Sequence, residues 1–353
     1  MLRWAFLAPR FHTNQVGWVE VLHDMGHAAF FGVQVRGQVE NYEAVEPHVF
    51  QDSERPGPME VRYWLRSIKA DRVVIRQRGS RLTAHLQVGA LASKHRPLMY
   101  SQHAAHSPSG SLGFALMARP PLSWTYRKRV TPVERRLTGY FSHQSHAMTF
   151  LPFVAPRAFE RVGAARPYVG ADERPLRLLA VGKFRERKQH LQVVDALRSM
   201  SAQELESLEL TVVGGSIKEE DRAYLESLRV LVDQSGLTER VRIQTQIDHA
   251  LMPQLMAQHD VLIQYSRDEP AAISPIEAMA TGMPVICHIE NGTAHYVCDA
   301  NAGVIVSERA QLVAAVRMLL ENREQVEVMG QRGHASALAN RLVATNTWSR
   351  LSS

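Results

Sequence analysis

Two glutamates, Glu269 and Glu277, have seven residues between them in the sequence. Glu269 follows an apolar run at residues 261–263 that predicts a buried strand, and Glu277 lies where a short helix is expected to begin. Carboxylates at the two ends of one such loop can accept hydrogen bonds from the hydroxyl groups of a ligand. The alternative is that Glu277 only caps the helix and that Glu269 is a solvated loop acid.

Local signals define the helix that carries Glu277. Ser274 is a favourable N-cap and Pro275 suits the first helical position, so Ser274 and Glu277 are predicted to form a capping box. Gly282 can end the helix in a left-handed conformation, and residues 283–287 predict the next buried strand. The stretch is therefore a strand–loop–helix–strand unit with a carboxylate at each end of its loop.

A group of four cations follows another predicted strand, which covers residues 176–182 and precedes a helix expected at about residues 191–200. The four cations are Lys183, Arg185, Arg187 and Lys188. A helix N-terminus attracts anions, and cations near it are unfavourable unless an anion is bound. The loop is therefore predicted to bind a diphosphate, and a solvated basic loop is the alternative.

Strands alternate with helices along the chain, which predicts parallel, doubly wound sheets with ligands at the carboxyl ends of the strands. In the first half the expected strands are residues 3–8, 28–33, 72–75 and 97–100, and the expected helices are residues 18–25, 58–69 and 82–94. In the second half the expected strands are residues 176–182, 208–213, 240–244 and 260–263, and the helices are residues 219–234 and 252–258.

These patterns indicate an α/β protein with two domains. Residues 1–165 are assigned to the first domain and residues 176–335 to the second. Residues 166–175, which mix Gly, Pro and charged residues, are assigned to the linker. Residues 336–353 are expected to cross back to the first domain.

Composition limits the classes of function. The chain has 353 residues, of which 45% are hydrophobic and 22% charged, as in ordinary globular proteins. Its two cysteines favour reduced thiols in a cytosolic protein, and no apolar run approaches the length of a membrane span. The net charge of +6 fits nucleic acid, an anionic membrane surface or phosphate-bearing ligands. Nucleic acid is the weakest of the three, because zinc-finger spacing, repeated basic helices and base-stacking motifs are absent from the sequence.

Histidines also occur at candidate positions. His103 follows the strand at residues 97–100, at a carboxyl end where ligands are expected, although a structural role is the alternative. His103 and His106, and likewise His143 and His146, have an i,i+3 spacing that could hold a metal. Neither pair has an acidic or cysteine complement, so the sequence predicts no metal site.

Residues 112–129 combine apolar and aromatic side chains with a cluster of Arg and Lys. This combination is typical of segments that lie on an anionic bilayer interface. The alternative is a helix packed on the sheet with a solvated basic turn. The segment is the candidate for docking a lipid-linked or anionic acceptor.

Taken in order, these residues resemble the retaining, family 4 glycosyltransferases of the GT-B fold, most clearly over residues 176–305. Residues 181–188 look like the V-G-R-x-x-x-x-K loop of that family, and residues 269–285 look like its E-P-F-G-x-x-x-x-E-A-M-A-x-G-x-P-V motif. The glycine turn of the family is matched at residues 214–215. The looser matches in the first half are residues 22–27 and 97–103.

The resemblance implies two facing Rossmann-like domains with a nucleotide-sugar donor in a central cleft. Lys183 and Lys188 would contact the pyrophosphate, Glu277 the ribose, and Glu269 the sugar hydroxyls. The implied catalytic residues are Glu269, Lys188 and His103. The implied donor-binding residues are Gly182, Lys183, Arg185, Gly214, Ala272, Ile273, Ser274 and Glu277, with Asn14 and His106 on the acceptor side.

The chain departs from the family pattern at several positions. Residues 13–14 are Thr-Asn where the family has Gly-Gly, and residues 271–272 are Ala-Ala in place of Phe-Gly. Lys183 replaces an arginine and loses bidentate geometry, which Arg185 could restore. Residues 291–295 replace a glycine-rich turn that ends in glutamate. Donor choice is expected to depend on residues 271–272.

The resemblance implies a metal-independent, retaining transfer of a sugar from a UDP- or GDP-sugar to a glycan, lipid-linked or other hydroxyl acceptor, with no cofactor. It implies a role in cell-envelope or polysaccharide synthesis, in the cytoplasm or at the inner face of the membrane. Cations and a helix dipole can stabilise a leaving diphosphate without a metal, and the sequence has no D-x-D pair. The alternatives are a sugar-nucleotide epimerase or phosphorylase of the same fold, and a non-catalytic nucleotide-sugar-binding module.

Overall fold

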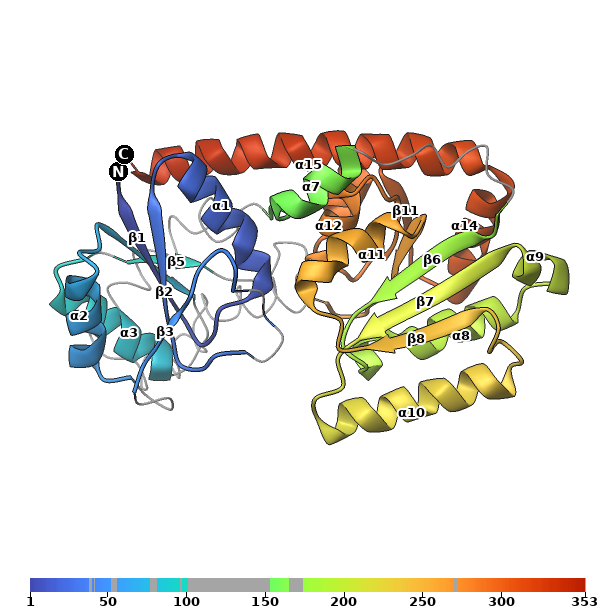
Figure 1. Ribbon diagram of the computed structural model, residues 1–353, viewed down its shortest axis with the longest axis horizontal. Coiled ribbons are helices and arrows are strands. Elements are labelled where there is room, and N and C mark those ends of the chain that lie inside the picture. The colour runs from blue at the N-terminus through green and yellow to red at the C-terminus, as the bar shows by residue number, and fades with distance from the viewer. Residues whose placement is uncertain are drawn as a thin grey trace, which may run out of the picture. The chain divides into compact units, whose positions relative to one another are not determined.

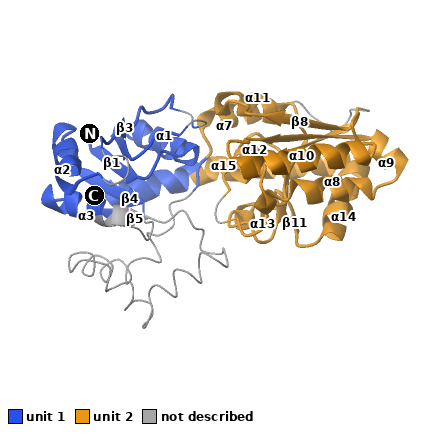
Figure 2. Cartoon of the chain, turned by 90° about the horizontal axis from the view of Figure 1, so that it is seen from below, with its two compact units in different colours: residues 1–154, 341–353 blue, residues 155–340 orange. Residues whose placement is uncertain are grey.

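The computed structural model describes residues 1–37, 40, 42–51, 56–76, 81–95, 97–100, 153–164, 174–269 and 272–352. The chain divides into two compact units (Figure 2). Unit 1 comprises Met1–Val154 with Arg341–Ser353, and unit 2 comprises Ala155–Asn340. Each unit is built on a parallel sheet with helices packed against it, which confirms the predicted α/β class.

The sheet of unit 1 has the strand order β3-β2-β1-β4-β5, and every described pair is parallel (Figure 1). The strands are β1 (Arg3–Ala8), β2 (Ala28–Val33), β3 (His48–Val49), β4 (Arg72–Arg76) and β5 (Leu98–Tyr100). The helices are η1 (Thr13–Gln15), α1 (Val16–Asp24), α2 (Pro58–Ser67) and α3 (Arg81–Ala92). The predicted strands at 3–8 and 28–33 agree with β1 and β2 at both ends.

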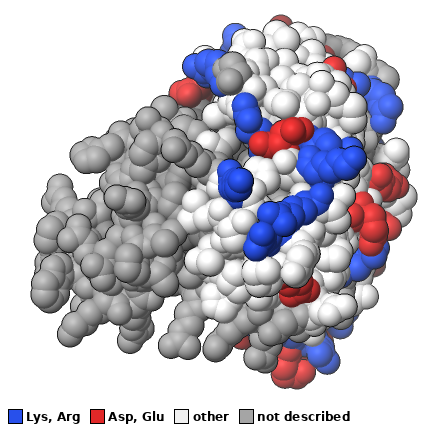
Figure 3. Space-filling view, turned by 90° about the vertical axis from the view of Figure 1, so that its left-hand side faces the viewer, with Lys and Arg blue, Asp and Glu red and all other residues white. Residues whose placement is uncertain are grey.

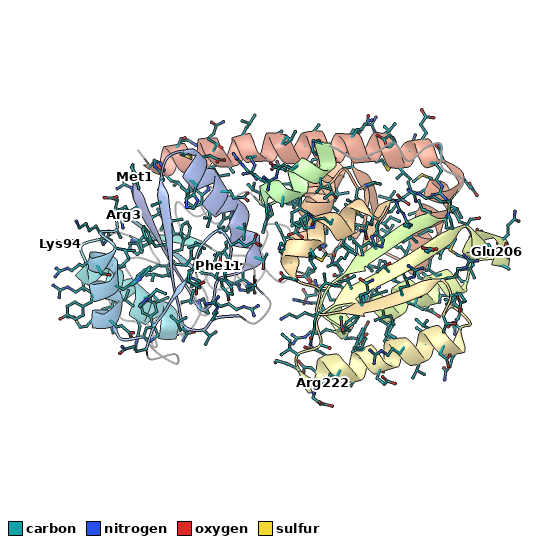
Figure 4. The ribbon with its side chains drawn as sticks, in the orientation of Figure 1. Met1, Arg3, Phe11, Lys94, Glu206 and Arg222 are labelled. Carbon is teal, nitrogen blue, oxygen red and sulfur yellow. The ribbon has the colours of Figure 1, made fainter. Side chains whose placement is uncertain are left out.

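The end of the last helix, α15 (Arg323–Ser352), completes the core of unit 1. Trp348 is fully buried, with its ring centroid 5.1 Å from that of Trp4 and 5.8 Å from that of Phe6 in edge-to-face arrangements. Phe11, labelled in Figure 4, is also buried in this core, 4.8 Å from the ring of Phe31. The C-terminal residues therefore belong to unit 1 by packing, although they follow unit 2 in the chain.

The sheet of unit 2 has the strand order β11-β10-β9-β6-β7-β8, again parallel throughout the described pairs. The strands are β6 (Leu176–Val181), β7 (Leu208–Gly214), β8 (Val241–Thr245), β9 (Val261–Gln264), β10 (Val285–His288) and β11 (Gly303–Val306). The helices are α7 (Arg157–Ala164), η2 (Glu186–Lys188), α8 (His190–Arg198), α9 (Ala202–Glu206), α10 (Glu219–Gln234), η3 (His249–Leu251), α11 (Met252–Ala257), α12 (Ser274–Ala280), α13 (Ala294–Asp299) and α14 (Arg309–Glu321).

The strand order of unit 2 reverses between β6 and β9. The chain leaves β6 toward β7 on one side of the sheet, and it leaves β9 toward β10 on the other side. Loops that follow two such strands diverge and leave a crevice at the carboxyl edge of the sheet, which is the usual ligand site of open α/β sheets. The cationic loop follows β6 and the two-glutamate loop follows β9, so both predicted motifs lie at this switch point.

The observed division of the chain differs from the predicted one. Unit 2 begins at residue 155, and α7 is part of it. Phe159 of α7 is 1% exposed and its ring centroid lies 5.7 Å from that of His249, while Gly163 packs against the carbonyl of Ala280. These contacts attach α7 to unit 2, and the predicted linker lies mostly outside the described residues.

Glycine is required at two positions in unit 2, one at a close approach of strands and one at a helix end. A Cβ on Gly214 would lie 2.2 Å from the carbonyl oxygen of Gly182, so the ends of β6 and β7 pack together only with glycine at residue 214. Gly282 has φ of +70° and ends α12, which confirms the predicted left-handed residue.

Within the described part of the chain, none of the helices has the length and apolar character needed to cross a membrane.

Candidate active site

Lys188 and Glu269 join the two sequence motifs at the switch point of unit 2. Lys188 Nζ lies 2.7 Å from Glu269 Oε2, and Arg187 Nη2 lies 3.5 Å from the same oxygen. Glu269 is 6% exposed, and the side chain of Lys188 is 14% exposed. Oε2 has no hydrogen-bond donor in alignment with it among the described residues, so the contact is an ion pair of poor hydrogen-bond geometry.

Backbone bonds hold the loop after β9 on both sides. The N–H of Arg267 donates to the carbonyl of Arg187 at 2.9 Å, which ties this loop to the cationic loop. The N–H of Gly292 donates to the carbonyl of Glu269 at 2.8 Å, which ties it to the loop after β10. Glu269 is therefore fixed between the carboxyl ends of three neighbouring strands.

The predicted capping box of α12 is wrong. Ser274 is the first residue of the helix, the N-cap is Ile273, and no side chain caps the helix. Ser274 Oγ donates instead to Oε1 of Gln264 at 2.7 Å, and Nε2 of Gln264 donates to Ser266 Oγ at 2.5 Å. These buried hydrogen bonds connect α12 to the end of β9. The capping box does not form because the side chain of Ser274 bonds Gln264, the last residue of β9.

Glu277 is bonded to a histidine that the sequence analysis did not identify. Its Oε1 lies 2.9 Å from Nε2 of His249, and the carboxylate is 3% exposed in the first turn of α12, where the helix dipole favours negative charge. His249 begins η3 directly after Asp248, whose side chain caps that helix. An N-cap followed by histidine was the available signal, but the pairing with Glu277 depends on where the fold places η3 relative to α12.

Arg185 is engaged by an internal carboxylate. Its Nε lies 2.5 Å from Oδ1 of Asp221, which is fully buried at the start of α10 and also accepts from the N–H of Lys218. Burial alone would raise the pKa of Asp221, but the bonds from Arg185 and Lys218 lower the pKa below its ordinary value. Arg185 therefore holds the cationic loop against α10.

His190 holds the start of the cationic loop through a hydrogen bond to the backbone. Its ring is 2% exposed and Nε2 donates to the carbonyl of Gly182 at 3.1 Å. Burial lowers the pKa of His190 to about 4, with the Lys188 charge acting in the same direction and the Gly182 bond opposing it. His190 is therefore neutral at pH 7 and serves as a donor to the backbone at the end of β6.

The predicted residues fall into three groups. Those in unit 2 lie at the carboxyl ends of its strands or in the loops and first helical turns that follow: Gly182, Lys183, Arg185, Lys188, Gly214, Glu269, Ala272, Ile273, Ser274 and Glu277. Asn14 lies in η1 of unit 1, at the carboxyl end of β1. His103, His106, Ala271 and residues 112–129 lie outside the described residues.

In unit 1 the loop after β1 is fixed by a carboxylate where the family has Gly-Gly. Glu40 Oε2 accepts from the N–H of Thr13 at 2.6 Å and from its Oγ1 at 2.5 Å. Gly17 follows, and a Cβ there would lie 2.2 Å from the carbonyl oxygen of Val154. The Thr-Asn pair therefore begins the short helix η1.

Among the described residues, no three His, Cys, Asp or Glu side chains gather as ligands for a metal ion. Both predicted histidine pairs lie outside these residues.

Residues 164–336 match the family model described as "Glycosyl transferases group 1". This segment is similar to the group 1 glycosyl transferases. It contains both loops of the candidate site, so the Lys188–Glu269 pair lies inside the matched segment.

Curated relatives match parts of the chain. The lipopolysaccharide glucosyltransferase WaaG of Escherichia coli (strain K12) is 30% identical over 139 residues, covering 39% of this chain and 35% of the relative. The D-inositol 3-phosphate glycosyltransferase of Geodermatophilus obscurus is 29% identical over 184 residues, covering 50% of this chain and 40% of the relative. The matched stretches thus span less than half the length of these relatives.

Solved structures match nearly the whole chain in fold. A crystal structure of Anabaena HepE in complex with UDP has a TM-score of 0.68 at 13% identity and covers 99% of both chains. A crystal structure of WaaG has a TM-score of 0.57 at 17% identity and covers 95% of both chains. These likenesses confirm the GT-B fold predicted from the sequence.

Proposed function

We propose that this protein is a glycosyltransferase that binds a nucleoside-diphosphate sugar at the β6–β9 switch point of unit 2 and transfers the sugar to a hydroxyl acceptor. The observation that carries the proposal is the Lys188–Glu269 ion pair, which joins a cationic loop to a carboxylate loop. The group 1 family match supports it. So do the similar proteins, which include a glucosyltransferase, an inositol 3-phosphate glycosyltransferase and HepE in complex with UDP-glucose.

In this proposal the donor displaces an internal contact. Lys188 exchanges Glu269 for the diphosphate, and Lys183 approaches the same group. Glu269 then accepts hydrogen bonds from hydroxyls of the sugar. The N-terminus of α12 lies at the same edge, where the helix dipole favours an anion.

Glu277 is assigned to the ribose. A carboxylate that accepts two ribose hydroxyls must be fixed in orientation. The contact of Glu277 Oε1 with Nε2 of His249 supplies this condition. The pairing uses one oxygen of Glu277 and leaves the other to the ligand.

The chemistry is proposed as retaining and independent of a metal or cofactor. Charge develops on the leaving diphosphate in the transition state, and fixed cations beside it stabilise that charge. A phosphate oxygen takes the proton of the acceptor hydroxyl on the same face of the sugar. The residues of unit 2 then act by binding and electrostatics and form no covalent intermediate.

Peripheral attachment to an anionic membrane surface belongs to the same proposal. Residues 112–129, predicted to make it, lie outside the described residues. Figure 3 shows the side on which the N-terminus and α2 lie. There Lys and Arg side chains gather on the face, with acidic side chains among them and toward the rim. Such a face suits an acceptor that is anionic or carried on anionic lipid.

A screen of UDP-, GDP- and ADP-sugars, with and without acceptor alcohols, tests the proposal. The expected result is acceptor-dependent release of nucleoside diphosphate from one class of donor. Epimerised donor would indicate an epimerase, and sugar phosphate formed with inorganic phosphate would indicate a phosphorylase. Binding of a donor that is consumed with none of the acceptors would indicate a binding module.

A further inference from the structure

Asn291 lies beside Glu269 in the candidate site and was assigned no role above. The two residues form an isolated parallel bridge, and the N–H of Gly292 donates to the carbonyl of Glu269. Asn291 follows β10 at the carboxyl edge of the sheet, and it is 3% exposed.

The contacts of Asn291 fix the orientation of its amide. Its Oδ1 accepts from the backbone N–H of Thr293 at 3.1 Å and lies 2.9 Å from Thr293 Oγ1. A backbone N–H can only donate, so the atom facing it must be the amide oxygen. Nδ2 therefore points away from Thr293.

Nδ2 of Asn291 is a buried donor without a partner among the described residues. Buried amide groups in folded proteins are nearly always hydrogen-bonded, and one that is not requires an explanation. Glu269 Oε2 is likewise buried without an aligned donor, although Lys188 lies close to it. Among the described residues, the two bridged residues thus carry an amide donor without a hydrogen-bond partner and a carboxylate oxygen that has ion pairs but no aligned donor.

A pair of neighbouring hydroxyl groups fits this arrangement. Each hydroxyl can both donate and accept, so one can accept from Nδ2 while the next donates to the carboxylate. A diphosphate oxygen could accept from Nδ2, but it could not donate to Glu269. We propose that Asn291 and Glu269 together recognise two adjacent hydroxyls of the transferred sugar, and that Asn291 determines donor-sugar specificity. This inference rests on the proposed function and extends it to the class of sugar.

The test compares each donor with analogues that lack one hydroxyl. Wild-type protein is expected to prefer the parent donor over one deoxy analogue by at least about tenfold in kcat/KM, as expected of a site that hydrogen-bonds a hydroxyl. Asn291→Ala is expected to lower that preference to near unity. Its Kd for the free nucleoside diphosphate should stay within about twofold of wild type.

Two further variants separate recognition from structure. Asn291→Asp keeps the oxygen that Thr293 bonds and removes the donor, so it should lose the same preference. Asn291→Ser serves if the alanine variant fails to fold. A purely structural role would weaken parent and deoxy donors equally, and would leave their ratio at the wild-type value.

The proposal is overturned if folded variants keep the wild-type ratio of kcat/KM for parent and deoxy donors. It is also overturned if the variants lose as much affinity for the free nucleoside diphosphate as for the parent donor. If wild-type protein consumes none of the donors, the proposed transferase function fails. In that case the role of Asn291 is tested by calorimetry. The ratio of the Kd values for deoxy and parent donors is compared between wild-type protein and the Asn291 variants, and a loss of the wild-type preference supports the role.

Discussion

The ammonium nitrogen of Lys188 lies 2.7 Å from Oε2 of Glu269, although the two residues belong to loops that follow different strands. The pair is buried on the carboxylate side and partly open on the cation side. A ligand that requires the cation must therefore compete with the carboxylate, and this competition makes the first prediction.

Glu269→Gln is expected to tighten binding of the free nucleoside diphosphate by roughly threefold to tenfold, because Lys188 no longer has to leave an ionic partner. Turnover should fall in the same variant, since Glu269 is assigned to the sugar. Calorimetry with the nucleoside diphosphate measures the first effect. Glu186→Gln removes the same charge from an exposed position on the cationic loop and should change neither quantity. Weaker binding in Glu269→Gln would contradict the competition.

His249→Asn is expected to raise KM for the donor about tenfold with a smaller change in kcat. The reason is that Glu277 loses the bond that orients it, and bonds to charged groups contribute about 1.5–3 kcal/mol. His334→Asn is a matched control, because the Nδ1 of His334 bonds the carbonyl of Ala280 at the other end of α12. An equal rise of KM in both variants would mean that His249 acts only on the stability of α12.

Arg185→Ala is expected to lower the free energy of unfolding by about 1–3 kcal/mol, because Asp221 is left buried without its cation. Asp221→Asn in the same chain should recover part of the loss, since the uncompensated charge is gone. Urea denaturation of the two variants measures this. If Arg185→Ala keeps full stability and instead loses affinity for the diphosphate, Arg185 serves the ligand and not the fold.

Acid is expected to destabilise the wild-type protein through His190. Its folded pKa of about 4 lies below the ordinary value of 6.5, so the unfolded chain binds the proton more tightly. The contribution to stability is full above about pH 6.5 and is lost as the pH falls toward 4, by roughly 3 kcal/mol. His190→Gln can keep a donor for Gly182 and should show a flatter profile in that range. Equal slopes for the two proteins would contradict the assignment.

The positions of the two loops could be predicted because their signals are local. Apolar strands that end in glycine or in charge mark the carboxyl edge of a parallel sheet, and β6 and β9 confirm both. The contacts between the loops could not be predicted, because they depend on the strand order. The sequence shows neither that β6 lies beside β9 nor that Lys188 therefore meets Glu269.

Tertiary partners also explain the errors. Ser274 and Glu277 have the spacing of a capping box. In the structure Ser274 instead bonds Gln264 and Glu277 bonds His249, and both of these partners lie in other elements. The predicted boundary at residue 165 lies after the observed start of unit 2 at residue 155. The short helix α7 has one buried residue, Phe159, so its sequence gives little indication that it packs on unit 2. Patterns within one segment carry no information about such contacts.

Turnover of the donor found in the screen, measured in Lys188→Ala and Glu277→Ala, tests the central claim most directly. The account predicts that each variant loses at least about 100-fold in kcat/KM, equivalent to roughly 2.7 kcal/mol of transition-state stabilisation, while circular dichroism and Tm stay close to wild type. Turnover within about twofold of wild type in both folded variants would contradict it.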